Sequence, residues 1–344
     1  MSNYLVYLVS AGLSFLLALA LSPLLALIMR HFGIVDAPKG ARKIHEKKIP
    51  LGGGLAIWAT VFIVAFVGSD FRLAPSLPIA TLVGIFYASL AIMIGGLIDD
   101  KYNIRAWYQV MWTSLAGLII YLIGIRPAAL SSPFGGVITF DNFMFLADII
   151  TYLWLMGMMF TTKILDGLDG LVTGIAAIGA LLISILTLQS RWYQPEAANL
   201  SLIFMGACLG FLVWNWHPAK IFLGQGGSLF AGFMLAILAL IAGGKIATAF
   251  LVLGVPMLDM MRVAAYRVWH GQSIFHPDNE HFHFKLLHSG LSQRQAVLLL
   301  YAISFLFGMT TLFLQSRQLL VALSFLLVLM LLLGIWLSRR PSIG

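Results

Sequence analysis

Long hydrophobic segments alternate with short polar ones along the whole chain. Most of them have the length of about 17–25 residues that a helix needs to cross the hydrocarbon core of a bilayer. Backbone polar groups find no water there, so each segment is expected to be a helix. We predict eleven spans, of which the one at 228–242 is short for a full crossing. They lie at residues 4–30, 51–68, 77–98, 106–125, 143–162, 170–189, 197–215, 228–242, 245–268, 294–314 and 318–338.

The composition supports this interpretation. Of the 344 residues, 60% are hydrophobic and 10% are charged, whereas soluble domains have about 25% charged residues. We therefore predict an all-α polytopic membrane protein, and a single domain over 1–344, because no linker divides the spans. Residues 1–29 contain no Lys or Arg, so we expect the first helix to be retained rather than cleaved as a signal peptide. The single Cys208 cannot form an intrachain disulfide.

The basic residues predict an orientation. With the N-terminus outside, 16 of the 21 Lys and Arg residues fall on one side and 5 on the other. The positive-inside rule makes the first side cytosolic, so we expect a multi-pass protein of the plasma (inner) membrane. Nine of the 13 acidic residues fall on the same side. Because acidic residues contribute little to that rule, their distribution indicates a site on the cytosolic face.

Two acidic segments stand at the cytosolic ends of predicted spans. In GLIDDKYNIR, residues 96–105, the adjacent Asp99 and Asp100 repel each other unless a cation, a metal or a phosphate-bearing partner is near. In TTKILDGLDGLVTG, residues 161–174, Asp166 and Asp169 would share one face if the local turn is helical. Ionisable groups at membrane depth favour a functional site. A solvated helix end and a polar re-entrant turn are the structural alternatives.

Two further segments are suited to phosphate groups. DAPKGARKIHEKKIPLGGG, residues 36–54, is strongly cationic and turns back at its glycines, although such a loop also binds anionic lipid headgroups. NWHPAKIFLGQGGSLFAG, residues 215–232, has a glycine-rich turn before Ser228, which we expect to be an N-cap. The amides of such a turn at a helix N-terminus can bind phosphate.

The C-terminal part contains an expected ion pair and a histidine-rich loop. Asp259 and Arg262 have helical ion-pair spacing. In FHPDNEHFHFKLLHSGLS, residues 275–292, His281 and His283 would diverge on a helix, so a zinc site is not expected. We expect instead a basic, aromatic arm over a nucleotide or headgroup. Together, these carboxylates, cations and glycine turns suit phosphoryl transfer between a soluble substrate and one at the membrane surface.

The motifs, in order, resemble those of the polyprenyl-phosphate N-acetylhexosamine-1-phosphate transferases over nearly the whole chain. The matching segments are VDAPKGARKIHEKKIPLGGG, GLIDD, LDGLDGLVTG, NWHPAKIFLGQGGS, VPMLD with Arg267, and HPDNEHFHF. The resemblance implies transfer of a sugar 1-phosphate from a UDP-N-acetylhexosamine to polyprenyl (undecaprenyl) phosphate, with release of UMP. It also implies Mg²⁺, an envelope-polysaccharide pathway, no nucleic acid, and a homodimer. The His-x-His loop is closer to the GlcNAc branch than to the MurNAc-pentapeptide branch.

The resemblance also implies residue roles. Asp99 would accept or orient the proton of the lipid phosphate with support from Asp100, and Asp166 and Asp169 would hold the active-site loops and solvent around the metal. The usual ligand positions of the family are Lys163 and Gln225 here, so we expect a bound metal to be held instead by Asp99, Asp100 or Asp166. The substrate contacts would come from Lys48, Gly53, Lys163, Asn215, Lys220, Gly224, Gln225, Ser228, Asp259, Arg267, His281 and His283.

Some positions depart from the family pattern. Gln225 stands where the family usually has Asp, and Phe160 and Lys163 stand where two Asn are usual. Phe284 replaces a third histidine. The changes at the usual metal-ligand positions, Gln225 and Lys163, each make the site more positive. We hypothesise that the Lys163 ammonium partly substitutes for Mg²⁺; the alternative is a displaced Mg²⁺ held by the aspartates.

Three other functions remain open at this point. The chain could be an inactive relative that binds lipid phosphate, or a phospho-MurNAc-pentapeptide transferase. It could also be a secondary transporter, since broken helices and intramembrane charges mark transporters as well. The polar residues gather at one face rather than at the bilayer midplane, which favours the transferase.

Overall fold

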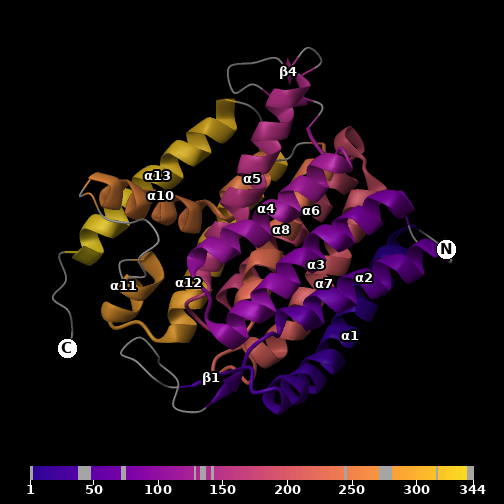
Figure 1. Cartoon of the computed structure of the whole chain (residues 1–344). Coiled ribbons are helices and arrows are strands. Elements are labelled where there is room, and N and C mark those ends of the chain that lie inside the picture. Colours follow the sequence, from indigo (N-terminus) through magenta and orange to yellow (C-terminus); the bar gives the residue numbers. More distant parts are fainter. Residues whose placement is uncertain are drawn as a thin grey trace.

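The protein is described by a computed structural model that covers residues 3–37, 48–70, 75–127, 129–131, 137–140, 143–243, 246–269, 271, 281–314 and 317–338. Helices form a bundle, and two short hairpins lie at its opposite ends (Figure 1). The elements are α1 Asn3–His31, β1 Val35–Asp36, β2 Ile49–Pro50, α2 Gly54–Asp70, α3 Ile79–Tyr102, α4 Ala106–Leu122, β3 Ala129–Ser131, β4 Val137–Thr139, α5 Met144–Leu165, α6 Leu171–Leu188, the 3₁₀ turn η1 Ser190–Trp192, α7 Pro195–Asn215, α8 Gly224–Ile241, α9 Ile246–Val252, α10 Gly254–Trp269, α11 Phe282–His288, α12 Gln293–Phe313 and α13 Arg317–Ser338.

Every predicted span coincides with helix, so the all-α polytopic class is confirmed. The ninth span is not one straight helix, because α9 and α10 meet at a bend of 75°. Pro256 lies in the first turn of α10 and has no N–H to donate back to α9, which explains the break. Among the described helices, seven are long and apolar enough to cross a membrane, or eight if the bent pair is one span. The count of eleven is therefore not confirmed: α2 and α4, for example, have 17 residues each.

Helix α8 is the centre of the bundle. It has 18 residues rather than the short span we predicted, and it contacts α2, α3, α5, α6, α7 and α9. Its apolar residues lie all round the helix, which is the pattern of a fully buried helix. Because the helix begins at Gly224, Ser228 is not its N-cap as predicted. The Ser228 hydroxyl donates to the Gln225 carbonyl, at 3.1 Å, inside the first turn.

Glycines let the beginning of α8 approach two other helices closely. A Cβ on Gly96 of α3 would overlap the backbone of Gly226, and a Cβ on Gly54 of α2 would overlap Gly227. Such backbone contact is possible only without side chains. It brings the acidic end of α3 against the glycine-rich first turn of α8, and so positions one wall of the site.

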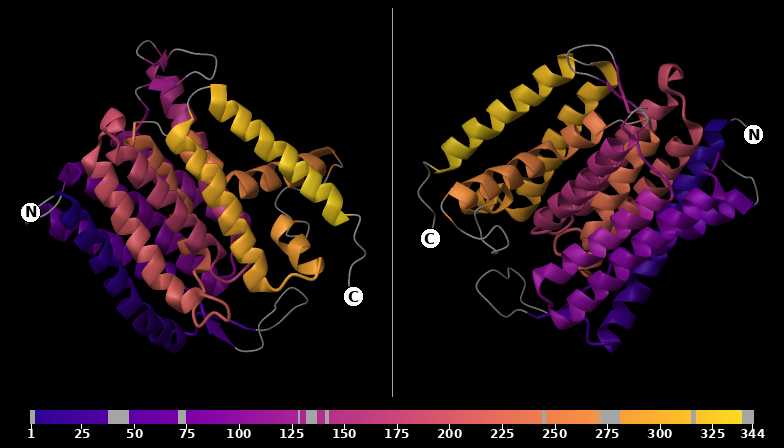
Figure 2. Two further views of the ribbon diagram at one scale, coloured as in Figure 1. Left: turned by 180° about the vertical axis from the view of Figure 1, so that it is seen from behind. Right: turned by 45° about the horizontal axis from the view of Figure 1, so that its top comes forward.

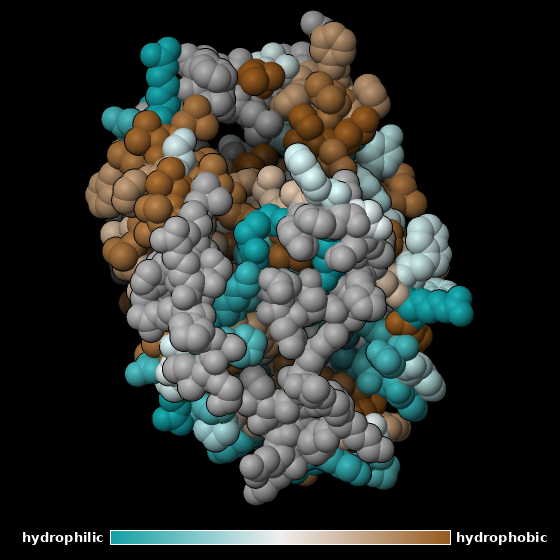
Figure 3. Space-filling model, turned by 90° about the vertical axis from the view of Figure 1, so that its left-hand side faces the viewer, coloured by the Kyte–Doolittle hydropathy of each residue, from teal (hydrophilic) through white to brown (hydrophobic). Residues whose placement is uncertain are grey.

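The outside of the bundle differs from one end to the other. Large exposed hydrophobic side chains occur along peripheral helices such as α1, α4, α5 and α13, as expected for surfaces that face lipid. Figure 3 shows that hydrophobic side chains dominate the upper part of one face, whereas hydrophilic ones gather lower down. Helices α10, α12 and α13 pack together along one side (Figure 2). We call the end that carries β1 and β2 the polar end.

Candidate active site

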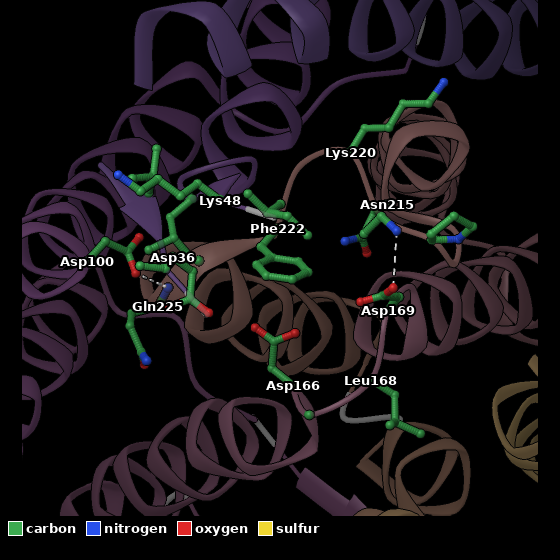
Figure 4. A pocket seen from close by; sticks show the side chains of 18 of the residues that line it. Asp36, Lys48, Asp100, Asp166, Leu168, Asp169, Asn215, Lys220, Phe222 and Gln225 are labelled. Atoms are coloured by element: carbon green, nitrogen blue, oxygen red, sulfur yellow. Dashed lines mark hydrogen bonds between the residues drawn. The ribbon is translucent and has the colours of Figure 1, made fainter. Parts of the chain in front are cut away.

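A cavity of about 1230 Å³ opens at the polar end. Its walls come from the β1–β2 segment, the end of α3, the turn after α5, the loop between α7 and α8, and the α11–α12 region (Figure 4). Segments far apart in the sequence thus meet at one pocket. The predicted site residues that line it are Lys48, Asp99, Asp100, Asp166, Asp169, Asn215, Lys220, Gly224 and Gln225.

Asp99 is engaged by the protein itself. The Ile104 amide donates to Asp99 Oδ1 at 2.9 Å, and the Gln109 side-chain amide donates to Asp99 Oδ2. The residue is only 5% exposed. With both oxygens accepting hydrogen bonds from the α3–α4 connection, Asp99 is suited to shaping that corner and poorly suited to the proton acceptance or metal binding that the family resemblance implied.

Asp100 faces the first turn of α8. Its Oδ1 accepts a hydrogen bond from the Gln225 amide at 3.0 Å. Gly224 has a φ of +79°, and a Cβ there would overlap Asp100 Oδ2, so only glycine permits this approach. The prediction that the amides of this turn are available to phosphate is therefore wrong for Gln225, whose N–H is taken by a carboxylate.

Asp166 follows the last residue of α5 and is open to the pocket. Its backbone, with φ −75° and ψ 53°, is not helical, so the condition under which Asp166 and Asp169 would share one helical face is not met. In Figure 4 Asp166 lies between Asp100 and Asp169. Withdrawal from bulk water, together with the charges of those two neighbours, raises the pKa of Asp166 to about 7. Because the side chain is open to the pocket, water there moderates this rise.

Asp169 and Asn215 brace the loops. Asp169 Oδ2 accepts from the Ala219 amide at 3.1 Å and contacts His217 Nδ1 at 2.7 Å. Asn215 Oδ1 accepts from the Gly170 amide at 3.1 Å, and from a threonine hydroxyl of α6. Its Nδ2 donates to the Ile221 carbonyl at 3.0 Å. Asn215 thus ties the turn after α5 to the loop before α8.

Acidic residues exceed basic ones among the described residues of the pocket wall. The Lys220 ammonium lies 4.9 Å from the centre of the Trp214 ring, which holds this cation at the rim. A bound diphosphate would be repelled by the acidic excess unless a further cation accompanied it. The acidic wall residues are Asp36, Asp99, Asp100, Asp166 and Asp169, and the basic ones are Arg30, Lys48 and Lys220.

Three predicted residues lie beside the pocket, not among its described lining residues. Lys163 is half-buried on the last turn of α5. Within the described ranges its side chain makes no hydrogen bond or ion pair, although its charge acts on Asp99 and Asp100. Ser228 is buried inside α8. The Gly53 amide donates to the Phe222 carbonyl at 2.9 Å.

The C-terminal motif forms a separate cluster. Asp259 receives the Arg262 guanidinium at 2.8 Å, which confirms the predicted ion pair, and also contacts His281 Nδ1 at 3.0 Å and the Phe282 amide at 2.9 Å. Of the described residues, Asp259, His281 and the buried Arg267 do not line the pocket. The substrate contacts expected of this motif therefore stay a prediction. Residues 275–280 and most of the first cationic loop, 38–47, lie outside the described residues.

His283 packs against the turn after α5. Its Nε2 is buried without a hydrogen-bond partner in the described chain, and a Cβ on Gly167 would overlap it. Burial and the nearby His281 lower the pKa of His283 to about 4. The two histidine rings are stacked, with planes 3° apart, so the predicted divergence is wrong: His281 precedes α11 and only His283 is inside it.

The oxygen donors of the pocket fit a magnesium ion shared with substrate. The described residues contain no group of three His, Cys, Asp or Glu that could hold a metal. Mg²⁺, however, usually takes one or two carboxylates and completes its shell with substrate phosphates and water. Asp100 and Asp166 supply two carboxylates, and the buried Gln225 Oε1 has no partner in the described structure. Asp99 fits less well, since both its oxygens are engaged.

Several residues of the pocket wall were not predicted from the sequence. His217 stands inside a motif that we quoted, but nothing in its local pattern distinguished it. Asp36 and Asn103 flank recognised motifs, and their polarity was the available signal. Phe284, in place of a third histidine, reaches the pocket although His283 does not.

The fold and site define an integral membrane protein with a polar pocket lined by carboxylates and cations. Residues 82–243 match Glycosyl transferase family 4. The chain is 33% identical, over 94% of its length and 88% of the relative, to the probable undecaprenyl-phosphate N-acetylglucosaminyl 1-phosphate transferase of Bacillus subtilis (strain 168). The chain therefore belongs to the polyprenyl-phosphate N-acetylhexosamine-1-phosphate transferase family, as its motifs predicted.

Two other relatives represent the two branches of the family. The decaprenyl-phosphate N-acetylglucosaminephosphotransferase of Mycobacterium tuberculosis (strain ATCC 25618 / H37Rv) is 32% identical over 80% of this chain and 74% of that protein. The phospho-N-acetylmuramoyl-pentapeptide-transferase of Halalkalibacterium halodurans is 29% identical over 90% of this chain and 98% of that protein. The lower identity to the second favours the N-acetylglucosamine branch.

Proposed function

We propose that this protein transfers N-acetylglucosamine 1-phosphate from UDP-N-acetylglucosamine to a polyprenyl phosphate and releases UMP. The single observation that carries the proposal is the convergence of separate polar motifs on one pocket at the end of a membrane bundle. The names of the relatives with 31–33% identity support the choice of lipid and sugar. The relatives named as pentapeptide transferases have 29% identity and offer weaker support for the alternative.

The dimensions of the pocket suit two substrates. Its volume of about 1230 Å³ exceeds the roughly 300–1,000 Å³ of ordinary ligand pockets. A nucleotide sugar can enter from the aqueous side, and a lipid phosphate can reach the same cavity from the membrane. Arg30, Lys48 and Lys220 are the described lining cations that would contact phosphate oxygens. We place this end on the cytosolic side of the plasma membrane, from the distribution of basic residues.

The reaction is a phosphoryl transfer. An oxygen of the lipid phosphate forms a bond to the sugar-bearing phosphorus of the UDP-sugar, and the bond from that phosphorus to the UMP oxygen breaks. Catalysis of such a step consists mainly of positioning and charge stabilisation. A bound Mg²⁺, held by Asp100 and Asp166 with the substrate phosphates, would neutralise negative charge. Asp99, Asp169 and Asn215 would hold the loops that shape the pocket.

Lys163 contributes to this arrangement through its charge. Its half-buried ammonium acts on Asp99 and Asp100 and is not among the described pocket-lining residues. It is thus better placed to relieve repulsion within the acidic pair than to contact a diphosphate directly. We therefore favour a displaced Mg²⁺ over full replacement of the metal by Lys163.

Purified protein in detergent, given polyprenyl phosphate and a panel of UDP-sugars, tests the proposed function. We expect UMP release and formation of lipid-diphospho-N-acetylglucosamine with UDP-N-acetylglucosamine, and little with UDP-MurNAc-pentapeptide. Asp100→Asn protein that elutes and melts like the wild type is the matched control. Binding of polyprenyl phosphate without UMP release from any sugar would instead identify an inactive relative. Transport into proteoliposomes without turnover would identify a transporter.

A further inference from the structure

His217 has a fixed position in the pocket wall. It lies in the loop between α7 and α8, and its side chain is 35% exposed. Its Nδ1 is 2.7 Å from Asp169 Oδ2. The Arg294 guanidinium, from the first turn of α12, donates to the His217 carbonyl oxygen at 2.9 and 3.1 Å. The ring and the backbone of this residue are thus held by different elements.

The contact with Asp169 selects one tautomer. An ionised carboxylate can only accept hydrogen bonds, so Nδ1 carries the proton and, in the neutral ring, Nε2 keeps its lone pair. Nε2 bonds to no atom of the described chain and is not among its buried unpartnered atoms. An imidazole oriented by a carboxylate, with its second nitrogen open, is the usual arrangement of a general base.

The carboxylates of the pocket are less suited than His217 to accept a proton. Both Asp99 oxygens and one Asp100 oxygen accept hydrogen bonds. Asp166 is open to the same pocket as Asp100, whose charge acts on it, and the two carboxylates suit a cation. Figure 4 shows Asp169, the partner of His217, across the pocket from Asp100, with Asp166 between them. Cation binding and proton transfer can therefore occupy separate sides of the pocket.

We propose that His217 is a further catalytic residue, whose Nε2 accepts the proton of the attacking lipid phosphate, and that Asp169 positions it. This rests on the proposed function. The monoanionic phosphate gives its proton to Nε2, and the freed oxygen bonds to the sugar-bearing phosphorus. UMP departs with the electron pair of the broken bond. The imidazolium then releases its proton to water, which restores the neutral ring.

Several charged groups around His217 can also affect the pH dependence of activity. Asp169 faces the ring from the turn after α5, Arg294 contacts its carbonyl from α12, and Lys220 belongs to the same loop. Asp166, which also titrates, shares the pocket. Asp166→Asn is therefore measured alongside the His217 and Asp169 variants, so that a change in the pH profile caused by Asp166 can be recognised.

The test compares the pH dependence of kcat/KM for wild type and His217→Asn. An asparagine amide can still donate to Asp169 in place of Nδ1, but it offers no base at the position of Nε2. A phosphate monoester loses its second proton near pH 6, so about half of the lipid phosphate is already dianionic at that pH. The variant is therefore expected to lose about twofold at pH 6, more below it, and to approach wild type at pH 9. KM for UDP-N-acetylglucosamine should not change.

Asp169→Asn supplies a second measurement. Its amide can donate to Nδ1 and so favours the tautomer with a proton on Nε2, which cannot accept another. The expected result is the same pH-dependent loss, with no further loss in the double variant. His288→Asn, at an exposed residue of α11, should match wild type.

Three results would contradict a role of His217 as the base. A loss of equal size at every pH, or a change confined to KM, would show that His217 binds substrate rather than takes a proton. Activity equal to wild type throughout would overturn the proposal. If wild-type protein releases no UMP in the same assay, the proposed function itself fails, and this role fails with it.

Discussion

Two aspartate clusters of this protein differ in how many donors reach the carboxylates. Asp259 is 4% exposed and receives hydrogen bonds from Arg262, His281 and the Phe282 amide, so its charge is compensated within the protein. Asp100 and Asp166 instead line a cavity, and the charge of Asp100 acts on Asp166. A charged residue near a membrane is therefore not by itself a functional site. The number of unoccupied oxygens distinguishes a structural anchor from a group available to a ligand.

Removing divalent cations should have the largest effect on activity, because it acts on the open carboxylates Asp100 and Asp166 and not on Asp259. With an acidic excess in the pocket wall, we expect exhaustive chelation to abolish UMP release and added Mg²⁺ to restore it. Binding of Mn²⁺, followed by electron paramagnetic resonance, should be lost in Asp100→Asn and kept in Asp259→Asn. Activity that persists without metal in wild type but disappears in Lys163→Ala would support the substitution of Lys163 for the metal instead.

Neutralising an open carboxylate should have the next largest effect. Asp100→Asn and Asp166→Asn are each expected to lower kcat by about 100-fold, the scale of one lost electrostatic contact at a reacting group. The apparent Tm should stay at or above that of wild type, since a repulsive charge is removed. A UMP-release assay and a thermal melt on the same preparation check this. Wild-type kcat in both variants would place the chemistry elsewhere.

Replacing Asp259, whose carboxylate oxygens are occupied by donors of the protein, should chiefly affect stability. Asp259→Ala leaves buried donors without an acceptor, which costs about 1–3 kcal/mol. We expect a lower apparent Tm and faster proteolysis near α11. Asp148→Asn is the matched control, because the Asp148–Arg126 pair is partly exposed and such pairs contribute about 1 kcal/mol or less. Equal shifts in Tm for the two variants would contradict the assigned anchoring role.

The smallest expected effect is on the pH dependence of stability. The pKa of Asp166 is about 7 in the folded state and 3.8 ordinarily. The unfolded chain therefore loses this proton first, and the contribution of Asp166 to stability declines as pH rises from about 4 to 7. His283, with a folded pKa of about 4 against 6.5, makes a contribution that is lost as pH falls through the same interval.

These opposite trends can be separated by single variants. Thermal melts of Asp166→Asn should show a steeper rise in stability between pH 4 and 6.5, because only the His283 trend remains. His283→Gln should show the reverse change. Parallel profiles for wild type and both variants would mean that neither side chain changes its pKa on folding. The effect of Asp166 should be modest, since water in the pocket moderates it.

The helical class, the position of nearly every helix, the family and most of the segments that line the pocket could be predicted from the sequence. The length and apolarity of segments decide where helices form in a membrane, and these are local properties. The Asp259–Arg262 pair was predictable for the same reason, as its spacing lies within one helix. Local spacing also located the GLIDD and LDGLDG motifs at helix ends.

Tertiary structure alone decided which polar atoms remain open. The engagement of Asp99 by Gln109, of Asp100 by the Gln225 amide, and of Asp169 by His217 all depend on how separate elements pack. So does the withdrawal of His283 into a buried position against Gly167. A hydrogen bond satisfies a carboxylate from any part of the chain that comes within about 3 Å. Residue spacing along the sequence does not contain that information.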